Sequence, residues 1–248
     1  MRDYQAPEGL LKDKVILVTG AGDGIGKTAA LTYARLGATI ILLGRTPEKL
    51  EAVYDQIEKE GGAQPAIAPL NLESASMVEY EQLAEQINST FGRLDGLLLN
   101  AAILGDITPL EFYKVDLFEK VMQVNVNAQF ILIKALLPLL KNAESGSIIL
   151  TTSSVGRRGR ANWGAYAISK FAVEGMMQTL ADELQNATKI RVNCINPGAT
   201  RTNMRASAYP AEDAAKLCPP EDIMWLYTYL MGKDSENVTG QSLDAQPK

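Results

Sequence analysis

The chain has 248 residues, of which 46% are hydrophobic and 21% charged, and this balance is typical of a globular protein that folds in water. Its formal net charge of -5 argues against nucleic-acid and anionic-membrane partners, and the sequence has no run of about 18 apolar residues of the kind that spans a membrane. Histidine is absent, the two cysteines are far apart and the N-terminus lacks an apolar signal core, so we expect a cytoplasmic protein without a disulfide framework or a metal site.

Short apolar segments alternate with helical patterns along the whole chain. The segments expected to be buried strands cover residues 14–19, 38–43, 64–70, 94–100, 147–152, 190–196 and 241–245. The expected helices cover residues 25–36, 47–60, 74–91, 113–142, 163–186 and 221–231. This alternation predicts the α/β class, with a single doubly wound Rossmann fold over residues 1–248 and helices on both faces of a seven-stranded, mainly parallel sheet. Residues 1–12 would precede the first strand as an extension.

A glycine-rich turn, TGAGDGIG at residues 19–26, follows the first expected strand and opens the first expected helix. Glycines at positions 20, 24 and 26 permit a tight turn and let a pyrophosphate approach the backbone at a helix N-terminus. This context favours nucleotide binding over a purely structural turn.

Gly44 and Arg45 directly follow the second expected strand. A site that prefers NAD places a carboxylate here for the ribose 2′-hydroxyl, whereas a guanidinium can pair with the 2′-phosphate of NADP. We therefore expect NADP(H) to be favoured over NAD(H). Asp23 in the glycine turn is a counter-signal, although it could equally cap the following helix.

Tyr166 and Lys170 lie four residues apart in a helical segment, so their side chains project from one face. A cation beside a phenol favours the phenolate and lowers its pKa, which would give an acid–base catalyst in a chain without histidine. The alternative is a Tyr–Lys pair on a solvated helix face.

Several motifs together resemble the short-chain dehydrogenase/reductase family over nearly the whole chain. The resemblance is carried by TGAGDGIG, by LLNAA at 98–102, by NVNAQF from residue 125, by TTSSVG, by YAISK and by NPGATRT. Finer detail in MQVNVNAQF, SSVGRRGRANWGAYAISKFA, RVNCINPG and TRTNMRASA is similar to the YciK-type oxidoreductases, a bacterial branch of the family.

The resemblance implies four catalytic residues and a set of cofactor contacts. Tyr166 would be the general acid–base group, Ser153 rather than its neighbour Ser154 would bind the substrate and polarise its carbonyl, and Lys170 and Asn125 would support the tyrosine. The implied cofactor contacts are Gly20, Asp23, Gly24, Ile25, Gly26, Arg45, Asn71, Leu72, Asn100, Tyr166, Lys170, Pro197, Gly198, Thr200 and Thr202. Asn71 stands where the family usually has an aspartate that contacts adenine.

The expected activity is hydride transfer between NADP(H) and a carbonyl or alcohol. A non-catalytic NADP-binding sensor on the same fold, and an epimerase or dehydratase variant, are the alternatives. Arginines cluster near the expected substrate mouth, which suggests an anionic substrate unless they pair with acids at a subunit contact or face water. These are Arg157, Arg158, Arg160, Arg201 and Arg205.

Residues 203–219 are expected to form a substrate lid, and Trp163 either lines the pocket or packs nearby. The apolar run QFILIKALLPLL exceeds what one buried helix face needs. Together with the family resemblance, it predicts a homodimer or homotetramer built on the helices at 113–142 and 163–186.

Overall fold

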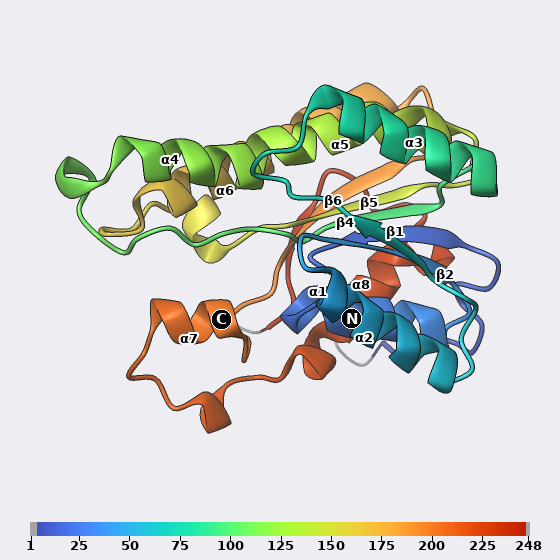
Figure 1. Ribbon diagram of the computed structural model, residues 1–248, viewed down its shortest axis with the longest axis horizontal. Helices are drawn as coiled ribbons and strands as arrows, with labels where there is room; N and C mark the ends of the chain where they lie inside the picture. The colour runs from blue at the N-terminus through green and yellow to red at the C-terminus, as the bar shows by residue number, and fades with distance from the viewer. Residues whose placement is uncertain (1–3, 247–248) are drawn as a thin grey trace.

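In the computed structural model, which describes residues 4–246, seven strands form one parallel sheet in the order β3-β2-β1-β4-β5-β6-β7 (Figure 1). The strands are β1 (Val15–Thr19), β2 (Thr39–Gly44), β3 (Ala66–Pro69), β4 (Gly96–Leu99), β5 (Ser147–Thr151), β6 (Arg191–Asn196) and β7 (Ser242–Asp244). The predicted doubly wound α/β fold is confirmed, and every ladder is parallel. The strand order changes direction between β1 and β4, which is where such folds bind ligands.

Helices cover both faces of the sheet (Figure 1). One layer contains α3 (Met77–Phe91), α4 (Val115–Met122), α5 (Ala128–Lys141) and α6 (Gly164–Gln185), and the other contains α1 (Gly24–Arg35), α2 (Pro47–Lys59) and α8 (Met224–Met231). The short helix α7 (Asn203–Ala208) projects away from both layers. Short 3₁₀ turns cover Leu110–Phe112, Ser154–Gly156, Ala214–Lys216, Pro220–Ile223 and Lys233–Ser235.

Each face of the sheet has its own apolar core because successive strand side chains point to opposite faces. Along β1, Val15 and Leu17 pack toward the layer of α3, α5 and α6, whereas Ile16 and Val18 pack toward α1, α2 and α8. Burial on both faces explains why the strands are almost continuously apolar in sequence.

The helix expected at 113–142 is continuous but not regular. A π-helical turn at Gln123–Asn127 joins α4 to α5, and turns of this type often occur at functional sites. The combined helix, Val115–Lys141, is long and apolar enough by length and composition to cross a membrane, a test that buried core helices also pass. Half of its most apolar window is buried inside the fold.

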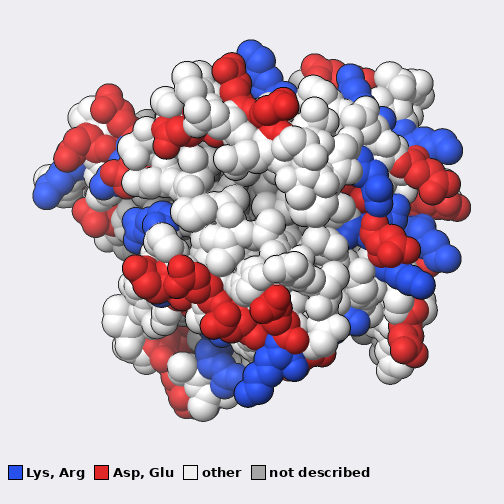
Figure 2. All heavy atoms as spheres, turned by 45° about the vertical axis from the view of Figure 1, so that its right-hand side comes forward, with Lys and Arg blue, Asp and Glu red and all other residues white. Residues whose placement is uncertain are grey.

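The N-terminal extension is packed against the domain from Tyr4 onward, whereas residues 1–3 lie outside the described part of the chain. The Tyr4 hydroxyl donates to Asp234, and the Leu11 side chain is buried. On the face shown in Figure 2, acidic and basic side chains are interspersed around a largely uncharged recess. Both cysteines are free thiols.

Candidate active site

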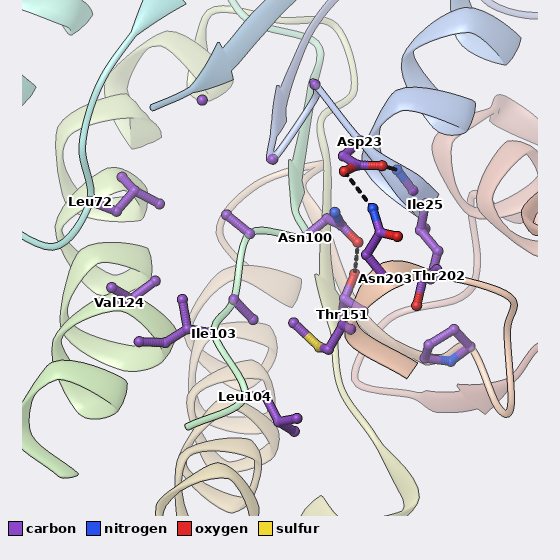
Figure 3. A pocket seen from close by; sticks show the side chains of 18 of the residues that line it. Asp23, Ile25, Leu72, Asn100, Ile103, Leu104, Val124, Thr151, Thr202 and Asn203 are labelled. Atoms are coloured by element: carbon purple, nitrogen blue, oxygen red, sulfur yellow. Dashed lines mark hydrogen bonds between the residues drawn. The ribbon is translucent and has the colours of Figure 1, made fainter. Parts of the chain in front are cut away.

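A cavity of about 650 Å³ lies at the carboxyl ends of the strands and extends beneath α7. This volume is in the range of small-molecule and cofactor sites. The cavity is lined by all the cofactor contacts expected from sequence except Gly26, and by three of the four expected catalytic residues, the exception being Asn125. Figure 3 shows side chains from several elements converging on it.

The glycine turn forms a backbone cradle at the switch point of the sheet. Gly20 and Gly24 have φ values of +66° and +50°, which L-residues with a side chain rarely adopt. A Cβ at Gly26 would lie 2.2 Å from the Gly20 carbonyl oxygen, so this glycine serves the close packing of α1 on the turn and not contact with a ligand. The bare backbone at the mouth of the cavity fits the pyrophosphate of a dinucleotide.

Asp23 is both the N-cap of α1 and the centre of a polar cluster at the cavity mouth. Its carboxylate accepts hydrogen bonds from the Gly24 amide at 2.8 Å, from Lys49 Nζ at 2.9 Å and from Asn203 Nδ2 at 3.0 Å. The Lys49 ammonium, followed by the Asn203 and Gly24 donors, lowers the pKa of this carboxyl, which therefore carries its charge at neutral pH.

Arg45 is exposed at the end of β2 and lines the cavity, as expected from sequence. Lys49, in the first turn of α2, lines the same end and was missed by the sequence analysis. Arg45 follows β2 and Lys49 belongs to α2, so their spacing of four residues does not indicate from sequence that they face the same site. The same end is closed by Asn71 and Leu72, which follow β3.

Asn100 lies at the floor of the cavity and is held by neighbouring strands. Its backbone amide and that of Ala101 both donate to the Thr19 hydroxyl, at 2.9 and 3.0 Å. The Thr151 hydroxyl donates to Asn100 Oδ1 at 3.3 Å (Figure 3). The end of β1 therefore holds the Asn100 backbone and the end of β5 holds its side chain, between the glycine turn and the catalytic side of the cavity.

Of the two adjacent serines, Ser153 lines the cavity and Ser154 does not. Ser153 follows β5 and caps a 3₁₀ turn, with its Oγ accepting from the Val155 amide at 3.4 Å. Because Oγ is the acceptor in this bond, the bond does not use the hydroxyl proton. The placement agrees with the choice of Ser153.

Tyr166 and Lys170 are both buried on the inner face of α6, with Lys170 Nζ 5.5 Å from the centre of the Tyr166 ring. The solvated-pair alternative is therefore wrong. The expectation that the cation lowers the pKa of the phenol is also wrong here, because burial raises the pKa of Tyr166 to about 12 and the neighbouring Ser153 hydroxyl offsets only part of this.

Burial also disfavours the ammonium of Lys170 and lowers its pKa to about 8. Its Nζ donates to the Thr151 carbonyl oxygen at 2.7 Å, which directs the side chain to the end of β5. Tyr166 is thus neutral at physiological pH and Lys170 is largely charged. The Tyr166 phenol therefore carries a proton that it can donate.

Asn125 is fully buried in the π-helical turn and does not reach the cavity. Its Nδ2 donates to the Ile103 carbonyl and to Ser169 Oγ, and its Oδ1 accepts from the Ile103 amide at 2.8 Å. The side chain thus ties the loop after β4 to α6, and its expected role beside Lys170 stays a prediction.

The loop after β6 carries the remaining expected cofactor contacts. Asn196 Oδ1 accepts from the Gly198 amide at 3.2 Å, and Gln246 Nε2 donates to the Pro197 carbonyl and to Thr200 Oγ1. Thr202 then caps α7, with its hydroxyl accepting from the Arg205 amide. The loop presents fixed backbone groups beside the catalytic side chains.

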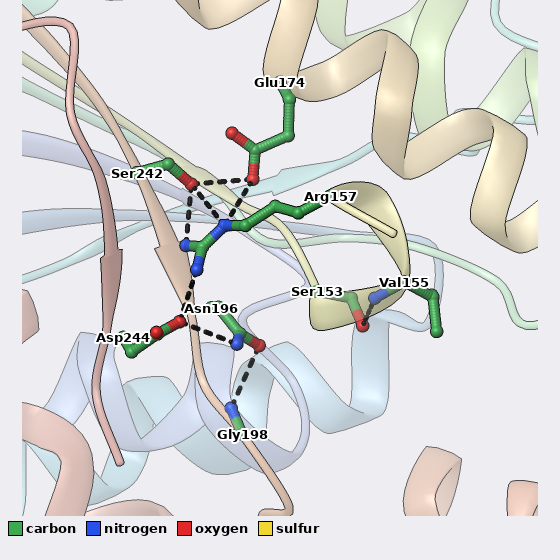
Figure 4. Close-up of polar contacts among 8 residues, drawn as sticks. All are labelled: Ser153, Val155, Arg157, Glu174, Asn196, Gly198, Ser242 and Asp244. Atoms are coloured by element: carbon green, nitrogen blue, oxygen red, sulfur yellow. Dashed lines mark hydrogen bonds and ion pairs between the residues drawn. The ribbon is translucent and has the colours of Figure 1, made fainter. Parts of the chain in front are cut away.

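Of the five arginines expected near the substrate mouth, only Arg205 lines the cavity. Arg157 turns away from the cavity and lies among Glu174, Ser242 and Asp244, at 2.6 Å from the last (Figure 4). Arg205 does line the cavity, but both of its guanidinium contacts to Glu212 are 2.6 Å and it stacks on Tyr209. Arg158, Arg160 and Arg201 are exposed and outside the lining.

The wall next to Ser153 and Tyr166 is apolar. Leu104, Trp163 and Met204 pack against the cluster formed by Val155, Tyr166 and Ala167. The Trp163 ring is 5.7 Å from the Tyr166 ring, and α7 supplies Met204 to the cavity lining. The lid expected at residues 203–219 stays a prediction. Within residues 4–246 no group of three or more acidic or cysteine side chains could hold a metal ion.

The family model described as "short chain dehydrogenase" matches residues 14–213. The oxidoreductase YciK of Escherichia coli (strain K12), described as uncharacterized, is 57% identical over 244 residues, covering 98% of this chain and 96% of its own. The 3-oxoacyl-[acyl-carrier-protein] reductase FabG of Thermotoga maritima is 31% identical, covering 93% and 95%.

Solved structures agree with this match. A short chain dehydrogenase from Shigella flexneri 2a, complexed with NADP, is 57% identical with a TM-score of 0.95, covering 97% of this chain and 100% of that one. A related chain from Escherichia coli CFT073, complexed with NADPH, is 57% identical with a TM-score of 0.94 and the same coverage.

Proposed function

The chain belongs to the short-chain dehydrogenase/reductase family, and from this premise we propose that it is an NADP(H)-dependent oxidoreductase that interconverts a carbonyl and an alcohol. The observation that carries the proposal is the meeting of Ser153, Tyr166 and Lys170 at one end of a cavity whose other end is a glycine-rich backbone cradle. A hydride-transfer site needs these two parts in one cavity.

A bound nicotinamide would supply the hydride. Tyr166 would donate the phenolic proton from Oη to the carbonyl oxygen, because burial keeps the phenol protonated. The Ser153 hydroxyl would donate a hydrogen bond to the same oxygen and so stabilise the charge that develops there. The Lys170 ammonium would stabilise the phenolate that remains, an effect strengthened by the low polarity of the buried site.

NADP(H) is supported at the adenosine end of the cavity. Arg45 lines it beyond β2, where a site for NAD would carry a carboxylate, and two relatives at 57% identity were crystallised with NADP or NADPH. The Gly20 and Gly24 backbone and the Asn100 amide offer the contacts for the rest of the dinucleotide.

For the substrate, we propose a carbonyl or alcohol with an apolar flank. Leu104, Trp163 and Met204 form the wall beside the catalytic hydroxyls, and the charge of Arg205 is matched by Glu212. That an arginine binds an anionic group of the substrate stays a prediction, and only for Arg158, Arg160 and Arg201.

We also propose that the protein is cytoplasmic and forms homo-oligomers through α4, α5 and α6. Phe130 on α5 and Ile168 and Phe171 on α6 are exposed, at 55%, 40% and 46% of their surface. Large apolar side chains exposed to water favour a subunit contact.

Tyr166→Phe tests the activity. NADPH oxidation is followed at 340 nm against a panel of quinones, aldehydes, diketones, keto acids and β-ketoacyl esters. Tyr54→Phe is the matched control, because Tyr54 is a half-buried residue of α2 that lies outside the cavity lining. We expect Tyr166→Phe to lower kcat by a factor of about 10² to 10⁴ with NADPH affinity nearly unchanged.

Turnover retained by Tyr166→Phe would show that the catalytic assignment is wrong. Tight NADPH binding with no turnover by the wild-type protein would favour the sensor alternative. Conversion of a substrate without net change in NADPH would favour the epimerase or dehydratase alternative.

A further inference from the structure

The carboxylate of Asp23 stands in the part of the cavity where the 2′-phosphate of NADP is expected. Asp23 and Arg45 both line this end of the cavity, and the pKa of Asp23 is lowered, so the carboxylate is ionised. A fixed negative charge near a phosphate weakens its binding. An aspartate at this position therefore needs a compensating charge if the site is to prefer NADP.

Lys49 supplies that compensation. Its Nζ lies 2.9 Å from Asp23 Oδ2, and about half of each side chain remains exposed, at 55% for Lys49 and 50% for Asp23. An ammonium group has three N–H donors, so one bond to Asp23 leaves donors free for a phosphate at the cavity mouth. Within residues 4–246 no ion pair engages the Arg45 guanidinium.

The position of Lys49 is fixed by the backbone around it. A Cβ at Gly22 would lie 2.8 Å from the Lys49 Cβ, so the bare backbone of the glycine turn allows the lysine stem to lie against it. The carboxylate is held from two other sides, because the Gly24 amide and Asn203 Nδ2 also donate to it (Figure 3). The start of the lysine stem and the position of the carboxylate together bring the ammonium to the cavity mouth.

We propose that Lys49 determines the preference for NADP(H) in this protein, by neutralising Asp23 and by donating to the 2′-phosphate together with Arg45. With Lys49 present, the charges of Arg45, Lys49 and Asp23 leave one net positive charge for the phosphate. Without Lys49, the charges of the Arg45 guanidinium and the Asp23 carboxylate cancel, and no net positive charge remains for the phosphate. The remaining acidic side chain in the lining, Glu73, is paired with Lys120 at 2.8 Å and lies outside this balance.

The inference rests on the proposed function only in taking NADP(H) as the ligand, and binding measurements test it without turnover. Dissociation constants for NADPH and NADH are measured by cofactor fluorescence for the wild type, Lys49→Met, Asp23→Asn/Lys49→Met and Lys59→Met. Lys59 is exposed in the last turn of α2, outside the lining, so its replacement by Met makes the same change of charge on the same helix.

We expect Lys49→Met to weaken NADPH binding about tenfold and NADH binding by less than about twofold. Replacing Asp23 by Asn in the same variant should recover part of the NADPH affinity, because the uncompensated carboxylate is then gone. Lys59→Met should keep the wild-type ratio of the two constants.

A ratio unchanged by Lys49→Met, in a wild type that prefers NADPH, overturns the inference and leaves the proposed cofactor intact. A wild type that binds both cofactors equally, with no effect of Lys49→Met, overturns the cofactor proposal as well. Equal NADPH affinity in the single and double variants overturns the role assigned to Asp23. Failure to reduce any carbonyl would affect the proposed activity and not this inference.

Discussion

The buried Lys170 ammonium should lower the stability of the folded protein although catalysis needs it. Lys170→Met tests this by removing the charge. The side chain is 1% exposed, and burial lowers the pKa of its ammonium from 10.5 to about 8. At about 1.4 kcal/mol per pH unit, this fall corresponds to about 3 kcal/mol of free energy spent on keeping the charge in the folded protein at neutral pH.

Methionine has a similar length and carries no charge. Its introduction removes that penalty but also the 2.7 Å hydrogen bond to the Thr151 carbonyl, whose loss costs about 1.5–3 kcal/mol. We expect the unfolding free energy of Lys170→Met at pH 7 to be equal to that of the wild type or up to about 1.5 kcal/mol above it. The variant should also lose carbonyl reduction.

The sign of the pH dependence follows from the lowered pKa. Between about pH 8 and pH 10.5 the unfolded wild-type chain binds more protons at Lys170 than the folded chain, so the wild type gains stability as the pH rises through this window. Lys170→Met has no such group and should lack this gain, so its advantage should disappear toward pH 10.

Urea unfolding followed by circular dichroism at pH 7 and pH 9.5 gives both quantities, with Lys59→Met as the control for loss of an exposed lysine. The reasoning would be refuted if Lys170→Met were less stable than the wild type by more than about 1 kcal/mol at pH 7. It would also be refuted if the difference between the two proteins did not depend on pH.

Two further variants test the packing around the site. Gly26→Ala places a Cβ 2.2 Å from the Gly20 carbonyl oxygen, so we expect it to lower the free energy of unfolding by more than about 2 kcal/mol in thermal unfolding. Gly159→Ala is the control, because no atom lies within 4 Å of the added Cβ, and it should change stability little. Equal effects of the two variants would contradict the packing argument. Arg157→Leu removes the cation between acidic side chains of α6 and β7 and should lower the free energy of unfolding by about 2–4 kcal/mol in chemical denaturation. Arg35→Leu removes an arginine from an exposed pair and should lower it by less than about 1 kcal/mol. Similar losses in both variants would show that the ion-pair network of Arg157 is not buried enough to stabilise the fold.

Much of the site could be predicted from sequence because its parts are local in the chain. The glycine turn, the YAISK segment and the loop after β6 each depend on a short motif at the end of one strand or on one helix. The carboxyl ends of parallel strands meet at one edge, so a correct strand pattern was enough to bring Gly20, Ser153 and Tyr166 into one cavity.

The arginine cluster shows where local reasoning failed. Arg157 is near Ser153 and Tyr166 in sequence, but its partners Glu174, Ser242 and Asp244 come from α6 and β7, up to 87 residues away. A long side chain can turn to either side of its backbone, and its direction depends on which charged groups lie nearby in space. Lys49 was missed for the same reason, since its partner Asp23 is 26 residues away.

The sequence by itself predicted the α/β fold with a parallel sheet, because this follows from the apolar period, and the resemblance to a family implied the catalytic side chains. The order of the strands came from the tertiary structure. The tertiary structure alone also decided the electrostatics of the catalytic side chains. Whether Tyr166 has a raised or lowered pKa, and which of the arginines and lysines face the cavity, depends on burial and on partners distant in the chain. Desolvation and ion pairing act through space, and no spacing in the sequence encodes them.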